Sequence, residues 1–278
     1  MAAGRPDLSA FAGGMRKTPV TMPPGICKGI FMQKNAHWAS PEGIRSRSRQ
    51  GVGVFAAYDG LLKNEDAAFV SDHNVMGEHA SFCAEAFAFL ARSCGIPSPA
   101  RIVDVGCGAG FVSSCLKARF PQAEVDAFDA SESAILFAKR HFSSVNFSVH
   151  VVDAYAKLPA AEPYDMIVCN EFYPFSRIDD AKMHAGLVAT LLASLPPGGV
   201  MFINQAITLP CIDVTLRDVC AELAGKAVFH VFQFPMKKMT DIMGMNRVSL
   251  FASRIAAPLL HRLRKRSPIL CVEVRHKK

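Results

Sequence analysis

Residues 103–110 read Val-Asp-Val-Gly-Cys-Gly-Ala-Gly, and this stretch decides the fold. Asp104 lies within a short apolar run, and glycines follow at every second position from 106 to 110. Such glycines let the chain turn sharply from a strand into a helix, so that backbone N–H groups at the helix N-terminus approach a ligand closely. A dinucleotide fingerprint would need its third glycine at position 111, which is Phe111. The stretch therefore predicts a cofactor loop that does not bind a pyrophosphate.

Further strands are predicted after this loop, and several of them end in polar residues. The predicted strand segments are 124–130, 147–155, 164–175 and, with its preceding turn, 196–204. Asp129 ends the first of them, nineteen residues past Gly110, the distance at which an acidic side chain accepts hydrogen bonds from ribose hydroxyls. Because a parallel α/β sheet binds its ligand at the carboxyl ends of its strands, each of these tips is a candidate contact.

The loop and the ordered tips resemble the class I, Rossmann-like S-adenosylmethionine-dependent methyltransferases. Glycines at 106, 108 and 110 behind Asp104 are similar to motif I of that family, whose cofactor has no phosphate. The resemblance implies a transferase with S-adenosyl-L-methionine as its cofactor. It also implies an α/β fold with a seven-stranded, mostly parallel, doubly wound sheet whose last strand is antiparallel.

The resemblance also implies a set of cofactor-binding residues: Asp104, Gly106, Cys107, Gly108, Gly110, Asp129, Ala130, Asp153, Ala154 and Asn170. Asp129 would bind the ribose, and Asp153 would accept a hydrogen bond from the adenine amino group. Ala154 or Tyr155 would offer a backbone N–H to the ring. Purely structural roles stay open for Asp104 within its strand and for Asp129 as the cap of a following helix.

The tip of the fourth strand is the candidate acceptor site. It reads Asn-Glu-Phe-Tyr-Pro-Phe from position 170, and so departs from the Asn-Pro-Pro-aromatic signature of methyltransferases that act on planar nitrogens. Glu171 beside aromatic rings suits a cationic or polar amine, or a hydroxyl that needs a general base. Glu171, Tyr173 and His79 are the catalytic candidates, with an ordinary surface or core role as the alternative for His79. Nitrogen and oxygen acceptors both stay open.

The sequence predicts three segments that differ in composition and in structure. Residues 1–52 are basic and rich in Gly, Pro and Ser, which predicts a disordered extension, either a solvated tail or an organellar transit peptide. Residues 53–98 predict a helical cap with a helix at 78–94. The core is expected at 99–278, with a helix at 213–224, strands at 227–234 and 269–274, and between these strands a basic insertion at about 236–267. That insertion is either a solvated basic helix or a contact for an anionic surface.

Composition narrows the class of protein. Half of the 278 residues are hydrophobic, which is ample for one globular catalytic domain, and no apolar run reaches the roughly 18–20 residues of a membrane span. The nine cysteines form no Cys-x-x-Cys pair, so we expect reduced thiols, no metal site and a cytoplasmic protein, with an organelle as the alternative.

The function expected from these features is methyl transfer to an N or O atom of a small molecule. The net charge of +7 leaves a second class open, an RNA or protein methyltransferase that holds a polyanionic or acidic partner. A non-catalytic methyltransferase-like scaffold is the third.

Overall fold

The computed structural model describes residues 77–151, 158–159, 162–177, 180–206, 227–233, 235, 237–252 and 269–276. The chain divides into two compact units, 1–35 and 36–278, and every described residue belongs to the second. The predicted N-terminal extension, the first part of the helical cap and half of the basic insertion lie outside the described residues. So do Asp153, Ala154 and the helix expected at 213–224.

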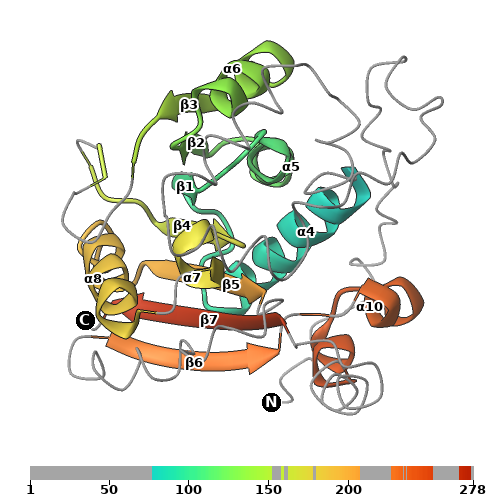
Figure 1. Ribbon diagram of the computed structural model, residues 1–278. Coiled ribbons are helices and arrows are strands. Elements are labelled where there is room, and N and C mark those ends of the chain that lie inside the picture. The colour runs from blue at the N-terminus through green and yellow to red at the C-terminus, as the bar shows by residue number, and fades with distance from the viewer. Residues whose placement is uncertain are drawn as a thin grey trace, which may run out of the picture. The chain divides into compact units, whose positions relative to one another are not determined.

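The described elements alternate between strands and helices. In chain order they are α4 Gly77–Ser93, β1 Arg101–Val105, α5 Phe111–Arg119, β2 Glu124–Asp129, α6 Glu132–His141, β3 Asn146–Val149, β4 Met166–Asn170, α7 Tyr173–Arg177, α8 Ala181–Leu192, β5 Val200–Ala206, β6 Ala227–Gln233, α10 Lys237–Met243 and β7 Ile269–His276 (Figure 1). The strand order in the sheet is β3-β2-β1-β4-β5-β7-β6. The pairings among strands β1 to β5 are all parallel, which confirms the predicted α/β fold. β7 pairs antiparallel with both β5 and β6.

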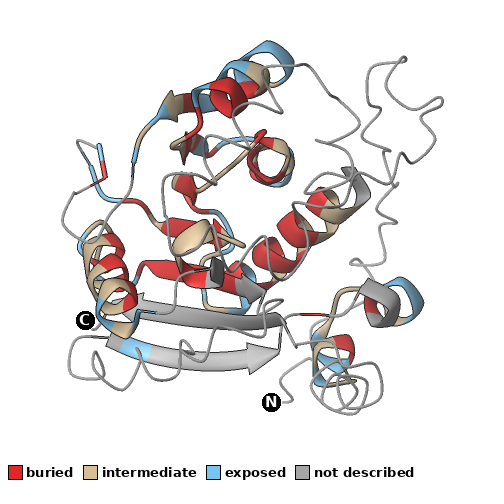
Figure 2. Ribbon diagram, in the orientation of Figure 1, coloured by how far each residue is buried: buried red, intermediate tan, exposed pale blue. Residues whose placement is uncertain are grey.

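The parallel strands are apolar because the sheet is covered on both faces. Successive side chains of a strand point to opposite faces, and β1 shows this directly. Ile102 joins a core formed with α4, α5 and α6, whereas Val103 and Val105 join a second core formed with α7 and α8. Figure 2 shows buried residues on the helices of both faces. Burying one such side chain fully contributes about 1.5–3 kcal/mol, so the two cores hold β1 and β4 firmly at the centre of the sheet.

Helix α4 forms within one residue of the predicted range. Small residues, among them Ala80, Ala84 and Ala88, are buried along it and allow a close approach to the sheet and to α5. The ring of Phe87 packs against Phe202 of β5 with centroids 6.0 Å apart. The helix thereby fixes its first turns, and with them His79, over the carboxyl end of the sheet.

Strand β3 is shorter than the sequence predicts. We expect a strand over 147–155, but β3 ends at Val149. Its partner β2 ends at Asp129, whose carbonyl accepts a last hydrogen bond from the His150 N–H at 2.9 Å, so no ladder partner exists beyond that point. The described residues 150 and 151 are thus not part of the strand, and Asp153 lies outside the described residues.

Two further findings concern the described part of the chain only. None of its helices combines the length and apolarity needed to cross a membrane. The cysteines at positions 83, 94, 107, 115 and 169 carry no disulfide.

Candidate active site

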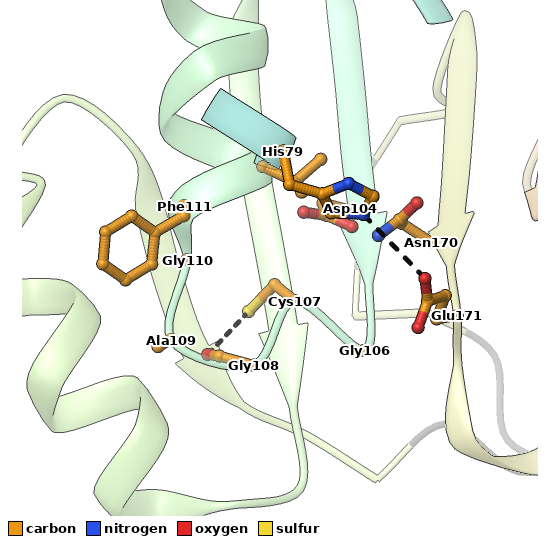
Figure 3. Close-up of a pocket in the computed structure, with 11 residues that line it drawn as sticks. His79, Asp104, Gly106, Cys107, Gly108, Ala109, Gly110, Phe111, Asn170 and Glu171 are labelled. Carbon is orange, nitrogen blue, oxygen red and sulfur yellow. Dashed lines mark hydrogen bonds and ion pairs between the residues drawn. The ribbon is translucent and has the colours of Figure 1, made fainter. Parts of the chain in front are cut away.

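A pocket lies at the carboxyl ends of β1 and β4, the position at which a parallel sheet binds its ligand. Its described lining consists of His79, Asp104, the loop residues 106–112, Asn170 and Glu171 (Figure 3). The structure thus brings together two of the three catalytic candidates and six of the cofactor candidates. Asp129, Ala130 and Tyr173 are described but do not line this pocket.

The glycine loop has the conformation that the sequence predicts. Gly106 and Gly110 have φ angles of 75° and 83°, in the left-handed region that favours glycine. A Cβ on Gly106 would run into the ring of Phe172, and a Cβ on Gly110 would lie 2.6 Å from Cε1 of Phe147. Both positions therefore require glycine for conformation and for packing.

Asp129 anchors this loop from the tip of β2. Its Oδ2 accepts a hydrogen bond from the Gly108 N–H at 2.8 Å, and its Oδ1 accepts one from the Ser131 N–H at 2.8 Å. Ser131, not Asp129, is the N-cap of α6, because its Oγ accepts a bond from the Ala134 N–H.

Asp104 is the buried acid of the pocket. Its side chain is 1% exposed, and its Oδ2 accepts a hydrogen bond from Ser113 Oγ at 2.6 Å. Its Oδ1 is buried and has no hydrogen-bond partner among the described residues. Burial, with a smaller contribution from the charge of Asp129, raises the pKa of Asp104 to about 7 against the lowering effect of the Ser113 hydrogen bond. An ammonium group placed at Oδ1 would satisfy this atom and favour the ionised carboxylate.

The tip of β4 is held by β5. Glu171 has a φ of 53°, an unusual conformation for a residue with a side chain, and its N–H donates to the Asn204 carbonyl at 3.0 Å. The Asn204 Nδ2 donates to Asn170 Oδ1 at 2.9 Å. Asn204, which is 1% exposed, is not among the site residues predicted from the sequence. The available signal was a polar residue at the carboxyl end of β5, in register with Asn170.

His79 and Glu171 face each other across the pocket, one from α4 and the other from β4 (Figure 3). Their Nε2 and Oε1 atoms are 4.0 Å apart, and their side chains are 42% and 29% exposed. His79 Nε2 also lies 3.5 Å from Cys83 Sγ. Burial raises the pKa of the Cys83 thiol well above its ordinary value, so this sulfur is protonated and not a nucleophile.

The aromatic residues of the β4 tip have other positions. The ring of Phe172 packs beside Gly106 and meets Phe175 edge to face at 5.8 Å. Tyr173 begins α7. Of the residues that follow Asn170, therefore, only Glu171 is among the described pocket lining. Within the described residues, no group of three or more His, Cys, Asp or Glu side chains has an arrangement that could hold a metal ion.

Comparison with known proteins identifies the class to which this site belongs. The family model of the methyltransferase small domain matches residues 74–233, more than half of the 278 residues. The chain therefore belongs to this family, and the predicted membership of the S-adenosylmethionine-dependent methyltransferases is confirmed. The cofactor of these enzymes is S-adenosylmethionine.

Individual relatives share about half of the chain. A trans-aconitate 2-methyltransferase of Acidovorax sp. (strain JS42) is 32% identical over 134 residues, 48% of this chain and 48% of its own length. A release factor glutamine methyltransferase of Deinococcus radiodurans is 32% identical over 156 residues, 46% of this chain and 56% of its own length. The chain thus spans about half the length of the relatives that it matches.

Solved structures show the same fold over more of the chain. The plantazolicin methyltransferase BamL, in complex with a substrate analogue and S-adenosylhomocysteine, has a TM-score of 0.56 at 18% identity, covering 84% of this chain and 100% of its own. The N-methyltransferase NodS of Bradyrhizobium japonicum, also with S-adenosylhomocysteine, has a TM-score of 0.51 at 14% identity, covering 81% and 98%. At these identities the likeness concerns the fold.

Proposed function

We propose that this protein transfers a methyl group from S-adenosylmethionine to an N or O atom of a small molecule. One observation carries the proposal: the glycine loop and the buried Asp104 line the same pocket as the His79 and Glu171 pair. The first two features suit a cofactor with an amino acid group, and the pair suits an acceptor that must lose a proton.

The cofactor-binding roles follow from chemical fit. Asp104 Oδ1, buried and without a described partner, suits the ammonium of the methionine moiety. Asp129, a carboxylate at the tip of β2 next to the glycine loop, suits the ribose hydroxyls, with Ala130 next to it in the chain. Asp153 and Ala154 are proposed on the adenine side from the sequence alone. Bound S-adenosylmethionine supplies a methyl group on a positively charged sulfur, already activated for displacement.

The protein then has to align and protect the reacting atoms. Methyl transfer requires acceptor, methyl carbon and sulfur in line, and positioning within a desolvated pocket supplies much of the acceleration. Asn170 and Glu171 would orient the acceptor, and Glu171 or His79 would take its proton. Tyr173 stays a proposed participant on the basis of its place at the start of α7.

Support for a small acceptor comes from the relatives and from the pocket. The relatives include methyltransferases named for trans-aconitate, a small molecule, and for a glutamine of a release factor, a protein. The pocket of this chain is formed within the domain between α4, β1 and β4. We also propose the full seven-stranded sheet, supported by the β6 and β7 pairings, and a cytoplasmic location, which stays a prediction from the cysteine pattern.

Calorimetry and label transfer test the proposal. The purified chain should bind S-adenosylmethionine and S-adenosylhomocysteine and give no heat with NAD. With a methyl-labelled donor and a cell extract, label should enter small molecules that pass a filter retaining macromolecules. Binding of NAD with no response to either sulfur compound would contradict the cofactor assignment. Label found only in protein or RNA would show that the acceptor is a macromolecule instead of a small molecule.

A further inference from the structure

We propose that the methyl acceptor is an amine that enters as an ammonium ion, pairs with Glu171 and gives up a proton to His79. The inference rests on the proposed methyl transfer and narrows its substrate class. Alcohol and carboxylate acceptors are the alternatives that it rejects.

The charges of the pocket favour a cation. Its described lining contains two carboxyl groups, Asp104 and Glu171, and one imidazole, and none of the lining residues that the structure describes is Lys or Arg. A carboxylate acceptor would therefore meet a like charge at Glu171 with no described cation beside it, which disfavours its binding. An ammonium ion would instead form a charge-assisted hydrogen bond with Glu171.

The carboxylate of Glu171 is both held and open to a ligand. Its backbone N–H is bonded to the Asn204 carbonyl at 3.0 Å, which fixes the turn that carries it. The side chain of Glu171 is 29% exposed, and that of His79 is 42% exposed. Both groups can therefore contact an acceptor while they remain 4.0 Å apart.

The chemistry of these two groups also suits an amine. An alkylammonium has a pKa of about 10.4, an imidazole of about 6.5 and a hydroxyl, judged by water, of about 15.7. Proton transfer to an imidazole is thus unfavourable by about four pKa units from an ammonium and by about nine pKa units from a hydroxyl. The imidazolium formed at His79 would be stabilised by the neighbouring Glu171 carboxylate.

The complete step balances. The ammonium loses one proton to His79 Nε2, and the nitrogen lone pair becomes free. That lone pair forms a bond to the methyl carbon while the carbon–sulfur bond breaks, and its electron pair remains on sulfur. The acceptor leaves as a methylated ammonium and the sulfonium becomes a neutral thioether, so one positive charge has moved from sulfur to nitrogen and one proton from the substrate to His79.

Label transfer into a small-molecule extract of the native cells tests the acceptor class. The extract is divided, and one half is treated beforehand with acetic anhydride followed by mild base, which blocks amines and restores hydroxyls. We expect labelled products that bind a cation exchanger at pH 7 and that disappear in the acetylated half. Label in neutral or anionic products that survive acetylation overturns the amine. Label in no fraction contradicts the proposed methyl transfer itself, so the two failures are distinguishable.

Variants test the proton transfer separately. With the labelled amine as substrate, His79→Asn should lower kcat/KM at pH 7 by about 100-fold or more, the usual contribution of a general base. The loss should shrink to less than about tenfold at pH 9.5, because the neutral fraction of an amine with a pKa of about 10.4 has then risen from about 0.04% at pH 7 to about 10%. His79 faces Glu171, Cys83 and, in the same pocket, Asp104, so Glu171→Gln is measured over the same pH range. It should raise KM for the amine.

Matched controls come from outside the pocket. His141→Asn, at the exposed end of α6, and Glu85→Gln, on the surface of α4, should leave the whole pH profile unchanged. Binding of S-adenosylhomocysteine by each variant shows that it is folded. An equal loss at every pH in folded His79→Asn would overturn the role of His79 as the proton acceptor.

Discussion

Asp104 shows how burial changes the chemistry of a single residue. Its pKa is raised to about 7, whereas in an unfolded chain it is about 3.9. Between these values the unfolded chain has lost a proton that the native state still holds. Folding stability contributed by this group is therefore highest near pH 4, falls as the pH rises towards 7, and is constant above that.

Asp104→Asn should remove this pH dependence. We expect the unfolding free energy of the wild type, minus that of the variant, to decrease from pH 4.5 to pH 7 and then to level off. Urea unfolding of the cofactor-free protein at several pH values measures this difference, in which contributions from other groups cancel. Two curves that run parallel across the whole range would contradict the raised pKa.

Asp129 offers a second test at the scale of one residue. Asp129→Ala should weaken binding of S-adenosylhomocysteine by about 1.5–3 kcal/mol, because charge-assisted hydrogen bonds to the ribose and to the Gly108 N–H are lost. Calorimetry gives the affinity. Asp180→Ala, which removes the N-cap of α8 instead, is the matched control and should leave affinity unchanged. An unaltered affinity in Asp129→Ala would move the ribose contact elsewhere.

At the scale of elements, the glycine loop combines backbone conformation with packing. Gly95 and Gly106 both have positive φ, but a Cβ on Gly95 would meet nothing within 4 Å, whereas one on Gly106 would meet Phe172. Gly95→Ala should therefore cost only the conformational term of about 1–2 kcal/mol. Gly106→Ala should cost clearly more, and adding Phe172→Ala should recover part of the excess. Equal costs for the two glycines, measured by urea unfolding, would mean that Phe172 moves aside freely.

At the pairing of β4 with β5, we expect a substitution to lower kcat and to leave cofactor affinity nearly unchanged. Asn204→Ala removes the bond to Asn170 Oδ1 and loosens the tip that carries Glu171. We expect kcat to fall about 10- to 100-fold through misplacement of the acceptor, with affinity for S-adenosylhomocysteine changed little. Asn146→Ala, at the amino end of β3, is the control and should leave kcat unchanged. Parallel loss of kcat and cofactor affinity in Asn204→Ala would place Asn204 in the cofactor site instead.

At the scale of the whole molecule, the net charge of +7 raises the question of a polyanionic partner. Changing the basic run Arg262, Arg264, Lys265 and Arg266, which lies outside the described residues, to Gln should leave kcat/KM for a small acceptor within a few-fold, because such an acceptor has no row of phosphates for these charges to bind. Steady-state kinetics across ionic strength measures this. A filter assay tests the alternative of an RNA methyltransferase. That alternative would be favoured by tight RNA binding that falls steeply with salt and is lost in this variant, together with methylation of the RNA.

The sequence by itself determined the cofactor loop and the succession of core strands along the chain. Glycines at 106, 108 and 110 are required by local backbone geometry. Apolar segments of strand length can be recognised in the sequence without knowledge of the rest of the chain. The same local signals placed Asp129 and Glu171 at strand tips. They failed for the end of β3, because the length of a strand depends on the partner beside it, and β2 ends at Asp129.

Only the tertiary structure decided which residues come together in the pocket and how they are held. His79 meets Glu171 although 92 positions separate them in the chain, and Asn204 holds the turn of Glu171 from a neighbouring strand. The raised pKa of Asp104 arises from burial, and its Oδ1 is buried without a partner among the described residues. These properties depend on distances between segments remote in sequence and on exclusion of water, and neither is encoded in any local pattern.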